Sequence, residues 1–248
     1  MSKFRMDAID KIFHMLEDPR YLYKAFTTGK FSAASYVMCS RLTKVIEAPE
    51  LIIDVGANVG QFSSCASIFF PKSKIDAFEP IPECFNILVK NTSAIKEINS
   101  YNFAIGDKDS SISFYVNAES QSSSALPTSD LRLKIFPNAY AEEEIVVEQR
   151  SLESFYKNSS IGKNALLKID VQGLEEKVLM GSQDILKNIR YILLEASVNP
   201  MYEGELTLPE MIKYTESLGY SLISITTASR SPISKNYIEF DLLFENKT

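Results

Sequence analysis

The chain has 248 residues, of which 45% are hydrophobic and 23% charged, with a formal net charge of -6 and a pI near 5.1. These values predict one principal soluble domain with an ample core. The acidic balance excludes a non-specific nucleic-acid surface, which needs clustered Lys and Arg. Three cysteines without metal-ligand spacing are expected to be buried free thiols, and no apolar stretch is long enough to span a bilayer. The sequence therefore predicts a cytoplasmic or peripheral protein without a transmembrane segment.

Residues 1–48 carry apolar positions at helical spacing, including Ile9, Ile12 and Leu16. The spacing predicts an N-terminal helical extension over 1–48, followed by a main domain over 49–248. We expect the extension to pack on the main domain or on a second subunit, which leaves a homodimer open; a substrate lid is the less favoured alternative. His14, the only histidine of the chain, lies in this extension and is expected to be structural rather than catalytic.

The segment LIIDVGANVG, residues 51–60, predicts a buried strand followed by a glycine turn that opens a helix at Gln61. Dinucleotide sites place a glycine where this turn has Asn58, so that the backbone can approach a pyrophosphate. The spacing of Gly56 and Gly60 after the acidic Asp54 suits a ligand that presents an ammonium and a carboxylate instead. S-adenosylmethionine is such a ligand.

From Leu51 onward, short apolar runs alternate with amphipathic segments, which predicts a βαβ series with a mainly parallel sheet. The predicted strands span 51–55, 74–78, 100–104, 166–169, 191–194, 221–226 and 240–244. The predicted helices span 61–70, 84–92, 174–187 and 208–218. The connection before the last strand is too short for a crossover helix, so we expect that strand to be antiparallel to its neighbour.

An extra hairpin is predicted at 111–117 and 145–149, between the third and fourth main strands. Residues 118–140 are rich in Ser and contain Pro127 and Pro137, which is typical of a long surface loop. Loops of that length are often functional, and disorder is the competing interpretation.

The second predicted strand ends at Glu79, at the distance from the glycine turn where an acidic residue accepts hydrogen bonds from ribose hydroxyls. The alternative is a solvated carboxylate at a strand end. Pro80 and Ile81 are expected to form an apolar wall for an adenine ring. The third strand ends in small residues, Ala104 to Gly106, which would allow the same ring to approach closely.

The segment LLKIDVQG, residues 166–173, delivers Asp170 and Gln172 to the carboxyl end of a buried strand, where ligands bind in open α/β sheets. Glu195 ends the next strand and is the second carboxylate of the pair. The alternatives are a helix cap for Asp170 and a rim ion pair for Glu195. Because histidine is effectively absent, Asp170 or Glu195 is the candidate general base. A magnesium ion held by Asp170, Glu195 and Asn199 is a disfavoured alternative, and no metal is predicted.

These motifs together resemble the FkbM family of S-adenosylmethionine-dependent methyltransferases. The resemblance covers about residues 51–244 and rests on DVGANVGQF, FEP, NFAIGD and LKIDVQGLEEKVLMG at 54–62, 78–80, 102–107 and 167–181, with weaker agreement in the serines 122–124. It implies a class I, Rossmann-like α/β fold with a seven-stranded sheet, the last strand antiparallel. It also implies methylation of a hydroxyl on a sugar, glycan or natural product. Leu174 precedes Glu175 where family members frequently have Ala, which affects the local pocket shape.

The resemblance also implies roles for individual residues. The cofactor-binding residues would be Asp54, Gly56, Ala57, Asn58, Gly60, Gln61, Phe62, Glu79, Pro80, Ala104, Ile105, Gly106 and Asp170. The substrate-binding residues would be Gln172, Glu175, Asn199 and Tyr202, and the catalytic residues Asp170 and Glu195. The expected acceptor is a small molecule or a glycan.

Three other functions are kept as alternatives. An N-methyltransferase would use the same cofactor site, so these motifs do not separate it from an O-methyltransferase. A cofactor-binding module that acts only as an assembly partner is disfavoured by the presence of Asp170 and Glu195. An NAD-dependent oxidoreductase is disfavoured because the third glycine of the dinucleotide fingerprint is missing.

Overall fold

A computed structural model of the chain describes residues 32–117, 122–159 and 161–246. Most of the predicted N-terminal extension, including His14, lies outside these residues. Its described part is the helix α3, Ala33–Val45, which begins with a cap in which Ser32 accepts a hydrogen bond from the backbone N–H of Ser35. No helix in the described part of the chain combines the length and the apolar character needed to cross a bilayer.

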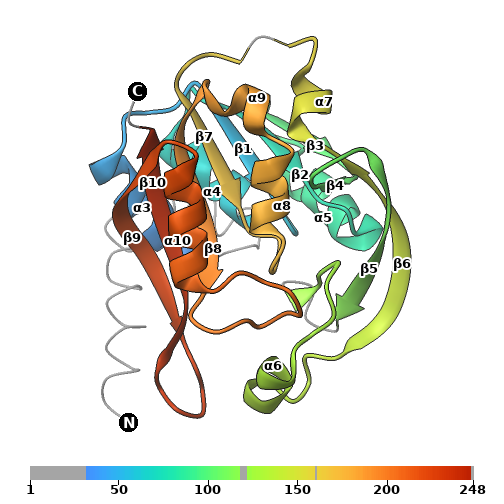
Figure 1. Cartoon of the computed structure of the whole chain (residues 1–248). Helices are drawn as coiled ribbons and strands as arrows, with labels where there is room; N and C mark the ends of the chain where they lie inside the picture. Colours follow the sequence, from blue (N-terminus) through green and yellow to red (C-terminus); the bar gives the residue numbers. More distant parts are fainter. Residues whose placement is uncertain (1–31, 118–121, 160, 247–248) are drawn as a thin grey trace.

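The centre of the molecule is a seven-stranded sheet with the strand order β3-β2-β1-β7-β8-β10-β9 (Figure 1). The strands are β3 Ile98–Tyr101, β2 Lys74–Phe78, β1 Leu51–Val55, β7 Ala165–Ile169, β8 Ile189–Ser197, β10 Tyr237–Asn246 and β9 Tyr220–Arg230. The first five are parallel, and β10 is antiparallel to both of its neighbours. The predicted seven-stranded sheet with an antiparallel last strand is therefore confirmed.

Helices cover both faces of this sheet (Figure 1). One face packs on α3, α4 (Gln61–Phe69) and α5 (Pro82–Thr92), around a core that includes Leu42, Cys65 and Leu166. The other face packs on α7 (Leu152–Tyr156), α8 (Glu175–Met180), α9 (Gln183–Leu186) and α10 (Leu208–Ser217). Strands covered on both faces are apolar at nearly every position, and all five residues of β7 are buried. All three cysteines are buried and free, as predicted.

The chain order reverses between β1 and β7, because β2 and β3 lie on one side of β1 and the later strands on the other. The loops that leave the carboxyl ends of β1 and β7 therefore diverge and leave a crevice between them, as in other doubly wound sheets. Gly56 and Asp170, the first residues after these two strands, lie side by side at this crevice: a Cβ on Gly56 would be 1.9 Å from the carbonyl oxygen of Asp170.

A second sheet of three strands, β4 (Ala104–Ile105), β5 (Ser110–Asn117) and β6 (Ala141–Arg150), extends past the carboxyl edge of the main sheet (Figure 1). The antiparallel pairing of β5 with β6 confirms the predicted hairpin. Between them, residues 122–140, here called the cap segment, contain the helix α6, Asp130–Ile135. The sequence predicted only a loop there, because a helix of six residues carries little periodicity.

Several predicted boundaries were wrong by a few residues, and two of the differences lie close to the second sheet. The third strand ends at Tyr101 rather than Ala104, because the side-chain amide of Asn102 donates to the carbonyl oxygens of Glu79 and Pro80 and turns the chain away from the main sheet. The helix predicted over 174–187 is two helices, α8 and α9, that meet at Gly181. A Cβ on Gly181 would lie 2.1 Å from the carbonyl oxygen of Gly106, so the small sheet packs against the break.

Candidate active site

A cavity of about 670 Å³ lies at the carboxyl edge of the main sheet. Its walls are the ends of β1, β2, β7, β8 and β10 together with the cap segment and the start of α3. Small-molecule and cofactor sites generally have volumes of about 300 to 1,000 Å³. Most of the residues that the sequence proposed for cofactor and acceptor line this one cavity.

The turn after β1 forms the first wall. Gly56, Asn58 and Gly60 all have positive φ, at 78°, 49° and 85°. The N–H groups of Gly56 and Ala57 donate to the carbonyl oxygen of Phe78 at the end of β2. Gly56 and Asn58 line the cavity, whereas Gly60 packs against Leu88 of α5, where a Cβ would be 2.7 Å from a side-chain carbon. The turn thus presents backbone toward the cavity while its second glycine lets two helices approach.

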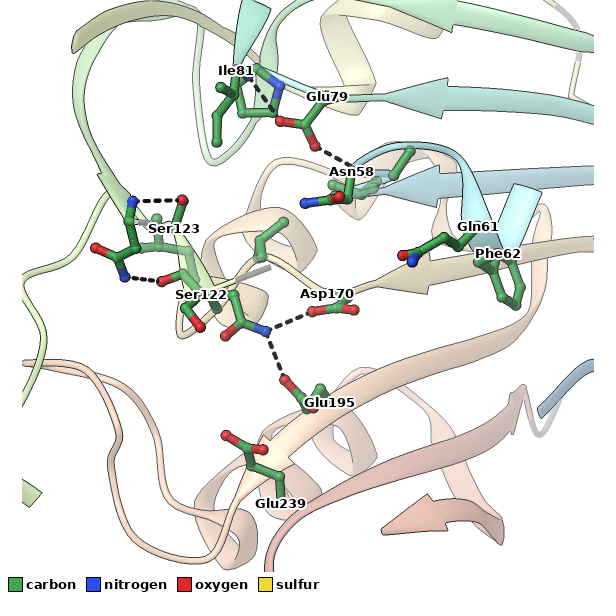
Figure 2. Close-up of a pocket in the computed structure, with 18 of the residues that line it drawn as sticks. Asn58, Gln61, Phe62, Glu79, Ile81, Ser122, Ser123, Asp170, Glu195 and Glu239 are labelled. Carbon is green, nitrogen blue, oxygen red and sulfur yellow. Dashed lines mark hydrogen bonds between the residues drawn. The ribbon is translucent and has the colours of Figure 1, made fainter. Parts of the chain in front are cut away.

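Glu79 lies opposite this turn and is only 4% exposed. One carboxylate oxygen accepts the N–H of Asn58 at 2.8 Å and the other accepts the N–H of Ile81 at 2.9 Å (Figure 2). Burial raises the pKa of Glu79 to about 7, although the two backbone N–H groups lower it. The carboxylate is therefore oriented by the backbone, and each oxygen keeps acceptor capacity for a hydroxyl group of a ligand.

Apolar side chains line the part of the cavity next to Glu79. Ile81, Ala104 and Phe114 belong to one buried cluster that joins the end of β2 to the small sheet, and all three line the cavity. Pro80 and Ile105 line it as well. Gly106, in contrast, is packed against the side chain of Gln149, where a Cβ would be 2.3 Å from the amide oxygen. An adenosine has a flat ring that needs an apolar wall and ribose hydroxyls that need an acceptor. The cavity offers both side by side, in this apolar cluster and in Glu79.

A buried lysine connects the two halves of the cavity. Lys168 on β7 places its Nζ 3.1 Å from Asp54, 3.5 Å from Asp170 and 3.3 Å from the carbonyl oxygen of Gly56. Burial lowers the pKa of Lys168, but the two carboxylates more than offset this and raise the pKa above its ordinary value. Asp54 is fully buried, accepts a 2.6 Å hydrogen bond from Ser63 and lies behind Lys168 rather than on the cavity wall.

Asp170 and Glu195 are joined by the side chain of Gln172 (Figure 2). The Gln172 amide nitrogen donates to Asp170 Oδ1 at 2.8 Å and to Glu195 Oε2 at 2.9 Å, and its oxygen accepts from the hydroxyl of Tyr202 at 2.9 Å. Gln172 has a φ of 57°, so the loop after β7 turns this side chain back over the strand ends. Burial and then the neighbouring Asp170 raise the pKa of Glu195 well above its usual range. The structure therefore brings the two predicted carboxylates into one hydrogen-bonded unit.

The other predicted acceptor residues do not line the cavity. Glu175 is 3% exposed and accepts the backbone N–H groups of Val171 and Gly173, so it supports the loop that carries Gln172. Burial raises the pKa of Glu175 to about 8. Tyr202 is buried, and its hydroxyl lies within hydrogen-bonding distance of the Ser122 carbonyl oxygen and the Gln172 amide oxygen. Asn199 is exposed and lies outside the cavity wall.

The cavity wall also contains polar and charged side chains that were not predicted as site residues, among them Ser123, Arg132, Lys168, Glu239 and Asp241. Glu239 and Asp241 alternate on β10, so both point to the same face of a strand that is otherwise largely apolar. The two alternating acidic residues in this strand were the feature of the sequence that could have identified them as site residues. Arg132 lies on α6, within a segment that the sequence predicted only as a loop.

In residues 32–117, 122–159 and 161–246, no group of three or more His, Cys, Asp or Glu side chains has an arrangement that could hold a metal ion. The carboxylates of the cavity are instead paired with cations, amides and hydroxyls, as described for Asp170 and Glu195. The donor set that the structure displays is one for an organic ligand with hydroxyl groups.

The sheet order, the glycine turn after β1 and the carboxylate at the end of β2 define a class I methyltransferase that uses S-adenosylmethionine. Comparison with known proteins agrees, because the model of the family described as "Methyltransferase FkbM domain" matches residues 54–222. The chain therefore belongs to the FkbM methyltransferase family, and the cofactor predicted from the sequence is the cofactor of this class.

Individual relatives of known name share about a quarter to a third of their residues with this chain over the matched regions. The chain is 26% identical to the 2-O-methyltransferase NoeI of Sinorhizobium fredii over 68% of its own length and 72% of the relative. It is 25% identical to the hexuronic acid methyltransferase AglP of Haloferax volcanii, over 64% of this chain and 62% of that protein. A match to methyltransferase sdnD of Sordaria araneosa, 33% identical, spans 32% of that protein. The chain thus spans less than two thirds of the last two relatives.

Among solved structures, TrmK of M. capricolum in complex with S-adenosylhomocysteine is similar, with a TM-score of 0.48 and 11% identity over 85% of this chain and 68% of that chain. A structural similarity this low does not support a family assignment, which depends instead on the match to the family model.

Proposed function

We propose that this methyltransferase transfers the methyl group to a hydroxyl oxygen of a sugar or glycan. The observation that carries the proposal is the Asp170–Gln172–Glu195 unit, which lies beside the cofactor turn in the same cavity. One relative is named as a 2-O-methyltransferase, which supports oxygen as the acceptor atom, and another as a hexuronic acid methyltransferase, which supports a sugar derivative as the acceptor.

For cofactor binding we propose the residues that line the cavity on the β1–β2 side: Gly56, Ala57, Asn58, Gln61, Phe62, Glu79, Pro80, Ala104 and Ile105. Glu79 would accept the ribose hydroxyls, and the cluster around Ile81 and Phe114 would cover the adenine. Asp54, Gly60 and Gly106 would act behind the wall, by fixing Lys168, α5 and the small sheet.

Bound S-adenosylmethionine supplies an electrophilic methyl group. The part of the protein is then to align the acceptor oxygen, to exclude water and to remove one proton. Asp170 lies on the cavity wall with one oxygen facing Lys168 and the other facing the Gln172 amide. We propose that the acceptor hydroxyl donates to the Asp170–Glu195 unit and that its proton passes to one of these carboxylates.

Gln172 is the proposed positioning residue of this unit. Its two amide N–H groups fix both carboxylates at once, and the Tyr202 hydroxyl fixes the amide in turn. Tyr202 and Glu175 would thus support acceptor binding without touching the acceptor. Asn199 lies outside the wall, so its contribution would require a large acceptor that extends past the cavity.

The test uses the conservative variants Asp170→Asn and Glu195→Gln, with Glu203→Gln as a matched control on an exposed site of the neighbouring loop. We expect the first two to bind S-adenosylhomocysteine in isothermal titration with unchanged affinity. Their turnover on a hydroxyl acceptor should fall by a factor of about 10² to 10⁴ in at least one of them. Full turnover in both variants would remove the proposed base.

Mass spectrometry of the products separates the acceptor atoms. A methyl ether on a glycoside supports the proposal, whereas methylation confined to amines would identify an N-methyltransferase that uses the same site. Cofactor binding with no methyl transfer to either acceptor class would favour a non-catalytic module.

A further inference from the structure

The end of the cavity opposite Glu79 is built around one buried cation of the cap segment. Arg132 is 6% exposed, and its guanidinium lies 4.8 Å from the ring centre of Tyr202 and 5.5 Å from that of Phe136. One terminal nitrogen donates to Ser122 Oγ at 3.0 Å, and the other lies 3.4 Å from Glu239 Oε1. The guanidinium of Arg132 is therefore held by two aromatic rings, a hydroxyl group and a carboxylate of the protein itself.

Carboxylates form a row along the strand ends at this side of the cavity. Figure 2 shows Asp170, Glu195 and Glu239 following one another from β7 to β8 to β10. Asp241 is directly opposite Glu195 in the antiparallel register of β8 and β10. Like charges directly opposite each other destabilise a strand pair, so a sequence that keeps them here bears a cost that the fold itself does not require.

Both cations on this wall already face carboxylates of the protein. Of the described residues that line the cavity, only Lys168 and Arg132 carry a positive charge, against five acidic side chains. Lys168 faces Asp54 and Asp170, and Arg132 faces Glu239. A carboxylate or phosphate on the acceptor would therefore enter a wall whose two cations each already face a carboxylate of the protein and whose acidic side chains outnumber them.

We infer that the acceptor half of this cavity selects a neutral, polyhydroxylated sugar, and that Glu239, held by Arg132, excludes sugars that carry a carboxylate beside the reacting hydroxyl. The inference rests on the proposed function and adds the charge of the substrate to it. Glu239 is the specificity-determining residue: its carboxylate accepts hydrogen bonds from sugar hydroxyls and repels a second anion.

The rest of the acceptor wall agrees with a hydroxyl-rich ligand. Ser122, Ser123, Asn117 and Ser229 line the cavity next to the carboxylates and present side chains that donate and accept hydrogen bonds. Burial raises the pKa of Glu239. Burial and then the neighbouring Asp170 raise the pKa of Asp241 to about 7. Both shifts have the direction expected where buried carboxylates lie close together, and sugar hydroxyls add no further charge.

The experiment compares methyl hexopyranosides with the corresponding methyl hexuronopyranosides, which differ only in the carboxylate at carbon 6. The full-length protein with S-adenosylmethionine is assayed on glucose, galactose and mannose pairs, and products are measured by mass spectrometry. We expect the kcat/KM of the neutral member of an accepted pair to exceed that of the uronide by about tenfold or more. In Glu239→Gln this ratio should fall toward one, because the repelling charge is gone.

Glu203→Gln, a matched change at an exposed position, should keep the ratio of the unmodified protein. Titration with S-adenosylhomocysteine and a thermal unfolding curve show whether Glu239→Gln is folded and binds the cofactor product. A second measurement needs no variant: each uronide is tested as an inhibitor of methylation of its neutral partner. The inference expects an inhibition constant at least about tenfold above the KM of the neutral sugar.

The outcomes separate the two proposals. Uronides methylated as well as or better than neutral sugars, or an unchanged ratio in a folded Glu239→Gln, overturn the inference and leave sugar O-methylation standing. If no hydroxyl of any glycoside is methylated while amino sugars gain an N-methyl group, the proposed function fails and the inference fails with it.

Discussion

The substitution Lys168→Met tests how the turn after β1 and the strand β7, which precedes the proposed base Asp170, are held together. Asp54 is fully buried, and Lys168 is the cation that lies 3.1 Å from it. Methionine keeps an unbranched apolar stem and removes the charged Nζ, which in the lysine lies 5.6 Å from the centre of the Phe62 ring. The hydrogen bond from Ser63 then remains as partner of a buried carboxylate without its counterion.

Breaking a buried ion pair by removing one partner costs about 3–5 kcal/mol, because it leaves an uncompensated charge. We therefore expect Lys168→Met to lower the free energy of unfolding at pH 7 by about 3–5 kcal/mol. The pKa of Lys168 is raised in the folded protein, so its contribution is fully present below the unfolded pKa. It is lost only as the pH rises through the higher folded pKa, and neutral pH lies well inside the stabilised range.

Urea unfolding followed by circular dichroism measures this change, with Lys163→Met as an exposed control that should stay within about 0.5 kcal/mol of the unmodified protein. The double variant Lys168→Met with Asp54→Asn removes both charges and should recover much of the loss. The reasoning is refuted if Lys168→Met lowers the free energy of unfolding by less than about 1 kcal/mol. It is also refuted if the double variant loses more free energy of unfolding than the two single variants lose together.

Further predictions concern the cofactor end of the site and the core. Because burial raises the pKa of Glu79 to about 7, and ribose hydroxyls favour its ionised form, affinity for S-adenosylhomocysteine should fall by up to about tenfold as the pH drops from about 7 to 6; a flat titration series contradicts this role. Gly56→Ala places a Cβ 1.9 Å from the carbonyl oxygen of Asp170 and should cost at least about 2 kcal/mol in thermal unfolding. Gly204→Ala, at a similar positive φ but with open space around it, should cost less. Tyr156→Phe removes a 2.7 Å hydrogen bond to a buried aspartate of β2, and a loss of about 1–3 kcal/mol in urea unfolding is expected.

The parallel strands were predictable because their residues are buried on both faces. Short, mainly apolar runs that lead to Glu79 and Asp170 identified β2 and β7, and parallel strands bring their carboxyl ends to one edge. The half of the cavity proposed for the cofactor follows from these two rules and from the glycine turn. The sequence did not reveal that Asp54 lies behind Lys168, because a spacing of residues along the chain does not say which side chain is nearer the ligand.

The acceptor half could be predicted only in part, because it depends on pairings between distant segments. Arg132 approaches Glu239 across 107 positions of sequence, and Tyr202 approaches Ser122 across 80. The antiparallel register that places Asp241 opposite Glu195 is likewise a tertiary choice. Local propensity and periodicity report neighbours within a few residues and cannot supply such pairs.

Asp170 joins the two halves of the site. One of its oxygens faces Lys168, which also contacts Asp54 and the turn that begins the proposed cofactor site, and the other accepts the amide of Gln172. Lys168 therefore connects the β1 turn to one of the two carboxylates proposed to receive the proton. Because β1 and β7 are neighbouring strands in register, the backbone of the sheet sets the distance between the β1 turn and Asp170. The fold thus places the proposed base relative to the cofactor before any acceptor binds, which is what alignment of an in-line transfer demands.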